Sequence, residues 1–241
     1  MGRAVFNRPI WIFLALFLSG QVLFARIVAP LRSSIEEMPP PLGPVAMKAL
    51  AFGDEEFLFR ATARWLQDVG DGGGRIRPLR DYDYDRVVGW LRALDGIDNR
   101  SDYIYELAAH YFGAIGDPSG APTRVGKIVD YFCTAALAQP ERRWPWMVWA
   151  AEKTRTVVKD PVLAGRMARD LMSLHGNPAV PPWLPLLAPP LYRIAGDEFA
   201  ARSVEMLPDI MELKQKLSEE LKKSRSEKGG LVRAEAQRKK M

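Results

Sequence analysis

The hydrophobic and polar residues of this chain follow two different patterns. An uninterrupted apolar run extends from Pro9 to Ala25, and no run of comparable length occurs in the residues that follow. From Val45 onward, apolar residues recur at intervals of three and four, which is the period of an α-helix with one buried face. The alternation typical of β-strands is almost absent. The pattern predicts an N-terminal apolar helix followed by an all-α domain.

The apolar run has the length and the flanking charges of a membrane anchor. It contains no charged residue, Arg8 precedes it and Arg26 follows it, and a helix needs roughly 17 to 25 residues to cross a bilayer. A cleaved secretory signal is the alternative, but a cut after Ala25 would place Leu23 where a small residue is required; a buried or interfacial helix is a third possibility. We expect an uncleaved transmembrane helix whose lipid-facing residues include Trp11, Leu14, Leu16, Leu18 and Leu23.

The charges beside the run favour one orientation in the membrane. Arg3, Arg8 and the chain amine lie on the N-terminal side, whereas Arg26 and Arg32 on the other side are followed by two glutamates. Positive charge resists translocation, so the N-terminus is expected inside the cell. The prediction is a single-pass protein of the bacterial inner membrane with a periplasmic C-terminal domain.

Changes in composition divide the chain into four parts. The anchor (1–30) is followed by a proline-rich linker (31–44), which we expect to be stiff and extended and to lift the domain off the bilayer. Residues 45–207 form the helical domain, and 208–241 form a charged amphipathic helix and a basic tail that is expected to be disordered after Gly230. Short turns separate helices predicted at 83–95, 102–115, 123–138, 144–158, 161–175, 183–195 and 197–222.

An earlier helix is predicted directly after Asp54-Glu55-Glu56, because carboxylates favour the positive start of a helix. Its apolar residues fall on one face and are Phe57, Leu58, Ala61, Trp65 and Leu66. The sequence Asp71-Gly72-Gly73-Gly74 then ends it.

Three stretches of the helical domain share a spacing of large, small and aromatic residues. They contain Tyr105, Ala108, Ala109, Phe112, Gly116, Asp117, Ile128, Phe132 and Ala135 in the first, Ala151, Asp160, Ala164 and Ala168 in the second, and Trp183, Tyr192, Gly196, Asp197 and Ala201 in the third. Over residues 83–207 this pattern resembles degenerate tetratricopeptide repeats, whose regular period is about 34 residues. An irregular helical bundle is the alternative. The resemblance implies an α-solenoid of helix pairs, as in membrane-anchored tetratricopeptide-like proteins of bacteria, which act mostly as scaffolds.

The net charge of +5 is confined to the tail, where ten basic residues after Leu213 face four glutamates. The helical domain therefore has no basic excess that would indicate nucleic-acid binding. The apolar stripe Ile210, Leu213, Leu217 and Leu221 is suited to capping the last repeat, to pairing with another helix or to forming a coiled coil. Two heptads are too few to predict an oligomer.

The sequence offers little material for catalysis, and we expect no catalytic residue, no cofactor and no metal ion. His110 and His175 have no partner at metal-ligand spacing, and Cys133 is predicted to be a buried apolar side chain. The run from Asp81 to Asp85 resembles the start of a calcium loop, but arginines replace the glycine and the glutamate that such a loop needs. Asp81 or Asp83 is therefore expected to cap a helix, and an enzyme would require Asp83, Asp85 and His110 to converge.

Two basic segments are the candidate protein-binding surfaces. The three closely spaced tryptophans, Trp144, Trp146 and Trp149, cannot all face one stripe of a helix. At least one is therefore expected to face a groove or a partner. The alternative is that the repeat core buries all three. Arginines flank these tryptophans and the glycine-rich loop. The candidate residues, chosen for exposure and charge, are Arg75, Arg77, Arg142, Arg143 and Trp144.

These features predict a non-catalytic, membrane-anchored scaffold or assembly subunit of a bacterial envelope complex that binds one or more proteins. The alternative is an accessory subunit of a larger membrane enzyme, in which the transmembrane helix is itself an interface. Ser19, Gly20 and Gln21 are small or polar enough for such a helix contact.

Overall fold

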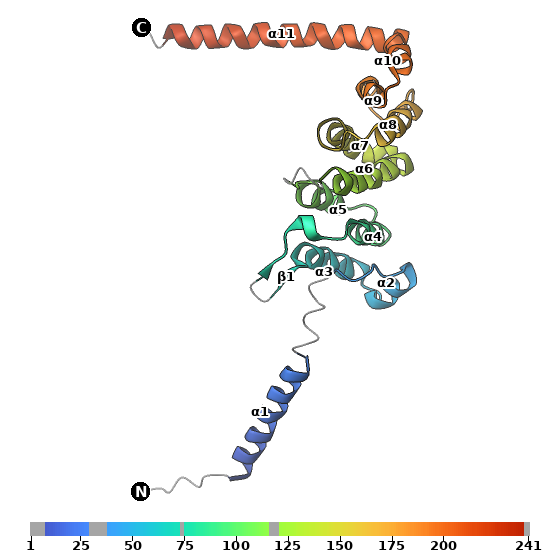
Figure 1. Ribbon diagram of the computed structural model, residues 1–241. Coiled ribbons are helices and arrows are strands. Elements are labelled where there is room, and N and C mark those ends of the chain that lie inside the picture. The colour runs from blue at the N-terminus through green and yellow to red at the C-terminus, as the bar shows by residue number, and fades with distance from the viewer. Residues whose placement is uncertain (1–7, 29–37, 73–74, 116–120, 239–241) are drawn as a thin grey trace. The chain divides into compact units, whose positions relative to one another are not determined.

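The computed structural model describes residues 8–28, 38–72, 75–115 and 121–238 (Figure 1). Its fold is all-α, as the periodicity predicts, apart from one pair of two-residue strands. The chain divides into two compact units, Met1–Ile104 and Tyr105–Met241. The elements are α1 (Arg8–Val28), α2 (Pro44–Ala51), α3 (Glu55–Asp68), β1 (Asp71–Gly72), β2 (Arg75–Ile76), η2 (Leu79–Asp81), α4 (Tyr84–Asp95), α5 (Tyr103–Leu107), η3 (Ala108–Phe112), α6 (Ala121–Ala138), α7 (Pro140–Lys153), η4 (Thr154–Val158), α8 (Pro161–Ser173), η5 (Leu184–Leu187), α9 (Ala188–Ile194), α10 (Glu198–Glu205) and α11 (Pro208–Arg238).

Over the described residues, no helix combines the length and the apolar character needed to cross a membrane. α1 is helical over 21 residues, and the side chains of Leu14, Leu16, Leu18 and Leu23 are exposed. The side chain of Trp11 lies outside the described part of the chain.

In the first unit, α2, α3 and α4 enclose a small core. Asp54 caps α3 by accepting a hydrogen bond from the Phe57 amide at 2.8 Å, and Asp83 caps α4 by accepting from the amides of Asp85 and Arg86. The sequence therefore located both helix starts correctly. The core side chains of these helices include Met47, Phe59, Ala63, Leu66, Val87, Leu91 and Leu94.

The C-terminal half of the predicted linker belongs to this unit. Arg86 donates a hydrogen bond to the Met38 carbonyl at 2.6 Å, and the Trp90 indole donates one to the Pro39 carbonyl at 2.9 Å. Met38 is only 4% exposed. Residues 38–43 of the predicted stiff linker therefore pack on α4, where the Met38 and Pro39 carbonyls accept hydrogen bonds from donors on that helix.

In the second unit, α6 through α10 follow one another as a series of packed helices (Figure 1). The connections are short, and Gln139 alone joins α6 to α7. Asp160 caps α8 by accepting from the Leu163 amide, and Asp197 caps α10 by accepting from the Ala200 amide. Two of the three turn aspartates therefore start helices, while Asp117 lies outside the described residues.

Four of the predicted helices differ in detail. The segments 102–115 and 144–158 each finish in five residues of π-helix, η3 and η4, and 183–195 begins as a short 3-10 helix. The segment 197–222 is two helices, because Pro208 lacks the amide that a continuous helix would need. Gly229 and Gly230 lie inside α11, so the predicted disorder after Gly230 is replaced by helix up to Arg238.

Candidate protein-binding groove

An apolar groove of about 360 Å³ lies on the first unit, between residues 39–42, α2, α3 and α4. α2 supplies one wall, and one face of α3 supplies the floor. Thr62 is the only polar residue among those that line it. The lining residues are Pro39, Pro40, Leu42, Met47, Leu50, Leu58, Ala61, Thr62, Trp65 and Trp90.

Two tryptophans from different helices fix one wall of the groove. The rings of Trp65 and Trp90 meet edge to face with their centroids 5.1 Å apart, a preferred geometry for aromatic pairs. Trp90 also holds the Pro39 carbonyl, and a Cβ atom on Gly89 would lie 2.6 Å from the Pro41 ring. α4 therefore positions residues 38–43, the proline segment, in two ways. The Trp90 indole binds it, and the missing side chain of Gly89 leaves room for Pro41.

A second hollow of about 200 Å³ lies on the other side of Met47. Leu42, Met47 and Leu58 line both spaces. The second hollow is more polar, because Lys48, Glu55 and Arg92 also line it. α2 thus has open space on both sides and contributes only Met47 and Ala51 to the buried residues.

The sequence placed the groove-forming residues of α3 on one apolar face but did not reveal that this face is open. The buried residues of α3 are Phe59, Ala63 and Leu66. Leu58 is half-buried, whereas Phe57 and Ala61 are exposed. The sequence of α3 does contain a signal for the groove, because the helix has two apolar faces. A surface helix needs only one apolar face to pack on its own domain, so the second is left for the groove.

The two basic candidates near the glycine-rich loop are located in the first unit. Arg77 is half-buried, donates a hydrogen bond to the Asp81 carbonyl at 2.7 Å and lies over the Tyr82 ring. It lines a hollow of about 250 Å³ with Asp81, Asp83 and Arg86, in which acidic and basic groups alternate. Arg75 lies in β2, and its side chain is outside the described part of the structure.

The other three candidates lie at the start of α7 in the second unit. Arg142 is exposed, as expected. Arg143 is only 1% exposed, so the expectation of exposure is wrong for this residue. Its guanidinium carbon lies 3.9 Å from the centre of the Tyr105 ring, and such stacking makes an aromatic core a favourable place for an arginine.

The tryptophans of α7 are neither fully buried nor fully exposed. Trp144 meets Trp183 edge to face at 5.7 Å, and Trp146 stacks on Tyr105 at 5.8 Å. Trp149 contacts Phe132 edge to face at 5.1 Å. The neighbouring helices therefore cover one side of each ring, and the arrangement lies between the two possibilities that the sequence left open.

The residues considered for chemistry do not form a reactive site. Burial, with help from Asp170 and Asp130, raises the pKa of Cys133 to about 12, so its thiolate is not available near neutral pH. His110 is exposed, and the Nε2 atom of His175 shares a hydrogen bond of 2.6 Å with the Asp209 carboxylate of α11. Within the described ranges, no three His, Cys, Asp or Glu residues are grouped so that they could hold a metal ion.

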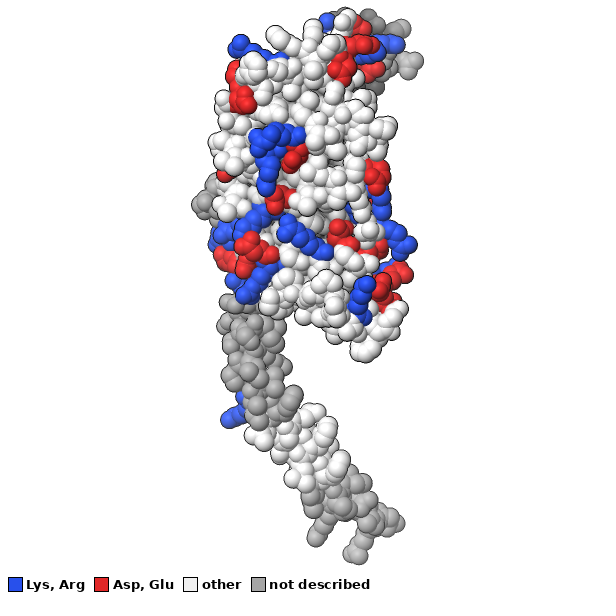
Figure 2. All heavy atoms as spheres, turned by 90° about the vertical axis from the view of Figure 1, so that its right-hand side faces the viewer, with Lys and Arg blue, Asp and Glu red and all other residues white. Residues whose placement is uncertain are grey.

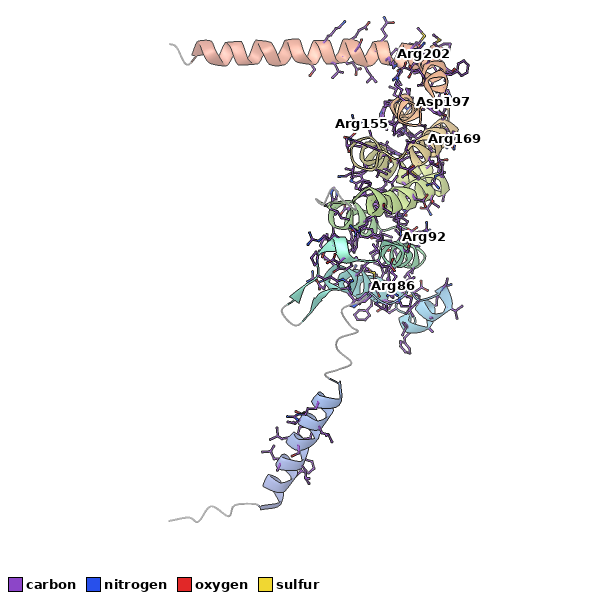
Figure 3. The ribbon with its side chains drawn as sticks, in the orientation of Figure 1. Arg86, Arg92, Arg155, Arg169, Asp197 and Arg202 are labelled. Atoms are coloured by element: carbon purple, nitrogen blue, oxygen red, sulfur yellow. The ribbon has the colours of Figure 1, made fainter. Side chains whose placement is uncertain are left out.

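Charged side chains on the face in Figure 2 occur as mixed groups of both signs. Many pairs join residues three or four positions apart, such as Arg155 with Glu152 and Arg202 with Glu198. Arg86 of α4 instead binds the Met38 carbonyl, and Figure 3 labels Arg86, Arg155 and Arg202. No broad patch of one sign is visible on this face. The apolar groove is consequently the most distinctive feature among the surfaces described.

Comparison of the chain with models of protein families, with curated proteins and with solved structures finds no match.

Proposed function

We propose that this chain is a membrane-tethered, non-catalytic protein-binding subunit whose groove receives an apolar helix of a partner protein. The observation that carries the proposal is the groove itself, with ten lining residues of which only Thr62 is polar. Amphipathic helices bind proteins by laying an apolar face into such a groove. A small-molecule site of this size normally has several convergent polar groups, which this groove lacks.

The tether is the part of the proposal that rests on the sequence from Pro9 to Ala25. At 1.5 Å per residue, the 21 residues of α1 extend over about 31 Å, close to the roughly 30 Å of a bilayer core. The charges at its ends favour the inner membrane with the domain in the periplasm. The repeat-like helices of the second unit suit a scaffold of the tetratricopeptide type, and we propose that role for them within a bacterial envelope complex.

A substitution that fills the groove tests partner binding directly in the native membrane. Ala61 is exposed on the groove floor, so Ala61→Trp fills the groove without disturbing the core. Ala138, also exposed but at the end of α6, provides the matched control Ala138→Trp. Tagged full-length variants are purified from gently solubilised membranes, and the co-purifying proteins are quantified.

We expect a specific partner to co-purify with the unaltered chain and with Ala138→Trp, and to be lost from Ala61→Trp. Equal recovery from both variants would contradict binding in the groove. The alternative, an accessory subunit bound through α1, predicts instead that Gly20→Leu removes the partner while Ala61→Trp retains it. Gly20 has open space around it in the structure, so the larger side chain perturbs only an external contact.

A further inference from the structure

The turn between α2 and α3 presents large apolar side chains to the exterior. Phe52 is 93% exposed, and Val45 and Phe57 are each more than half exposed. We call these three residues the α2–α3 tip. Val45 lies on α2, Phe57 on α3 and Phe52 at the turn between them, and exposed apolar side chains gathered around one turn are of the kind that marks an interaction site.

The backbone at Phe52 makes this exposure harder to explain by folding alone. Phe52 ends α2 in the left-handed conformation, with φ 47° and ψ 29°, and glycine is the residue that adopts this conformation without strain. A phenylalanine here is strained, and its ring gains almost no burial within the chain. Contact with a molecule outside the chain would bury the Phe52 ring, which the chain itself does not.

We propose that the α2–α3 tip inserts into the interfacial region of the lipid bilayer, as a second membrane contact beside the anchor. This inference rests on the proposed tether. Met38, which is fixed on α4, lies ten positions after Val28, the last residue of α1. Because an extended chain spans at most about 3.6 Å per residue, the docked segment stays within about 36 Å of the end of the anchor.

The short tether favours lipid as the binding partner of the α2–α3 tip. α2 begins only six residues after Met38, so the tip is carried at high effective concentration next to the bilayer surface. Exposed aromatic and aliphatic side chains partition into the interface when they are held there. Even a weak intrinsic affinity of the tip for lipid is then sufficient for insertion.

The charges around the tip confine it to the headgroup level of the bilayer, because the carboxylates of Asp54, Glu55 and Glu56 must stay in water. Asp54 is engaged as the cap of α3, and Glu56 forms an ion pair with Arg60. Lys48 on α2 is exposed and basic, and its long side chain can reach the phosphate layer while its stem covers apolar surface. Glu55, in the first turn of α3, is the remaining carboxylate of the turn.

A fluorescent probe in reconstituted vesicles tests the inference. Ala49, exposed on α2 next to the turn, is replaced by cysteine and labelled with an environment-sensitive dye. The native Cys133 is buried with a raised pKa and does not compete for the label. Full-length protein is reconstituted into phosphatidylethanolamine–phosphatidylglycerol vesicles that carry a nitroxide quencher at the lipid headgroup. Phe199→Cys provides the control, because Phe199 is 83% exposed on α10 in the second unit.

We expect lipid quenching at position 49 to exceed that at position 199 at least threefold, and Phe52→Gly to reduce it to the control level. Glycine suits the left-handed backbone, so this variant keeps its fold. Equal quenching at positions 49 and 199 in vesicle-bound protein would overturn the inference and leave a protein partner as the occupant of the tip. Failure of the protein to float with the vesicles would instead refute the tether, and the inference with it.

Discussion

The Trp90 indole donates a hydrogen bond of 2.9 Å to the carbonyl oxygen of Pro39. Together with the hydrogen bond from Arg86 to the Met38 carbonyl, it joins residues 38–43 to α4. It also completes a wall of the groove, because Pro39 and Trp90 both line it. Proline has no amide N–H to donate, but its carbonyl remains an acceptor, and here the indole of Trp90 uses it. The groove therefore depends on the docking of residues 38–43 on α4.

Gly89→Ala should displace the proline segment. The new Cβ atom would lie 2.6 Å from the Pro41 ring, while alanine within α4 offsets part of the cost by up to about 1 kcal/mol of helix propensity. We expect the unit to stay folded and the indole N–H of Trp90, which is hydrogen-bonded to the Pro39 carbonyl, to exchange hydrogen at least tenfold faster, as measured by NMR. Gly126→Ala in α6 is the control, since its Cβ would make only ordinary contacts at 3.7 Å. Unchanged exchange at the Trp90 indole would show that the segment is not held by this close approach.

Arg143→Ala should destabilise the second unit by about 2–4 kcal/mol, because it removes a fully buried side chain and its stacking on Tyr105. Urea denaturation of the full-length protein measures this loss. Arg142→Ala, at the exposed neighbouring position, should change the free energy of unfolding by less than about 0.5 kcal/mol. If both variants lost equal stability, the buried arginine would have no special structural role.

Cys133 should react with thiol reagents only when the second unit opens. Its pKa of about 12 leaves roughly one thiolate in ten thousand at pH 8, and burial excludes the reagent as well. We expect the rate of modification by a disulfide reagent at pH 8 to rise by at least about a hundredfold when urea unfolds the protein. A native rate similar to that of a small thiol would contradict the burial of this helix face.

The attachment of α11 should weaken in acid. Glu205 accepts hydrogen bonds from Arg193 at 2.8 Å and from Lys214 of α11 at 3.2 Å, and the contact with Arg193 is the main cause of its lowered pKa. A carboxylate with a lowered pKa stabilises the fold fully above its ordinary pKa, here 4.5, and this contribution disappears as the pH falls through the lowered value.

The variant Glu205→Gln should therefore lower Tm by about 1–4 °C at pH 7, and this difference should shrink as the pH falls below 4.5 and through the lowered pKa of Glu205. Thermal scans from pH 3 to pH 7 measure it. Glu220→Gln, at an exposed position of α11, should show no such pH-dependent difference. A Glu205→Gln effect of equal size at pH 3 and pH 7 would exclude the ionised carboxylate as its cause.

Local signals allowed the sequence to predict most of the helices. Asp54, Asp83, Asp160 and Asp197 begin helices because a carboxylate that accepts from backbone amides stabilises the first turn wherever it stands. Such features depend on few residues, so periodicity and caps are sufficient to find them. The break at Pro208 also has a local cause, but the prediction of one helix over 197–222 missed it.

The groove and the burial of Arg143 depend on residues distant in sequence, and no local signal contains them. Arg143 is buried because Tyr105, 38 positions earlier, presents its ring. Trp90 finds Pro39 across 51 positions. Arg143 followed by Trp144 has the composition of an exposed interface. Only the contact with Tyr105 shows that the arginine is buried.

Site-specific photo-crosslinking from the groove is the most direct test of the central proposal. A photoreactive amino acid replaces Ala61 in the full-length protein, the native membranes are irradiated, and crosslinked peptides are identified; the same amino acid at Ala138 is the control. We predict one partner peptide with an apolar helical stripe crosslinked from position 61 and absent from position 138. The same products from both positions, or lipid alone at position 61, would contradict the proposal that the groove binds a protein helix.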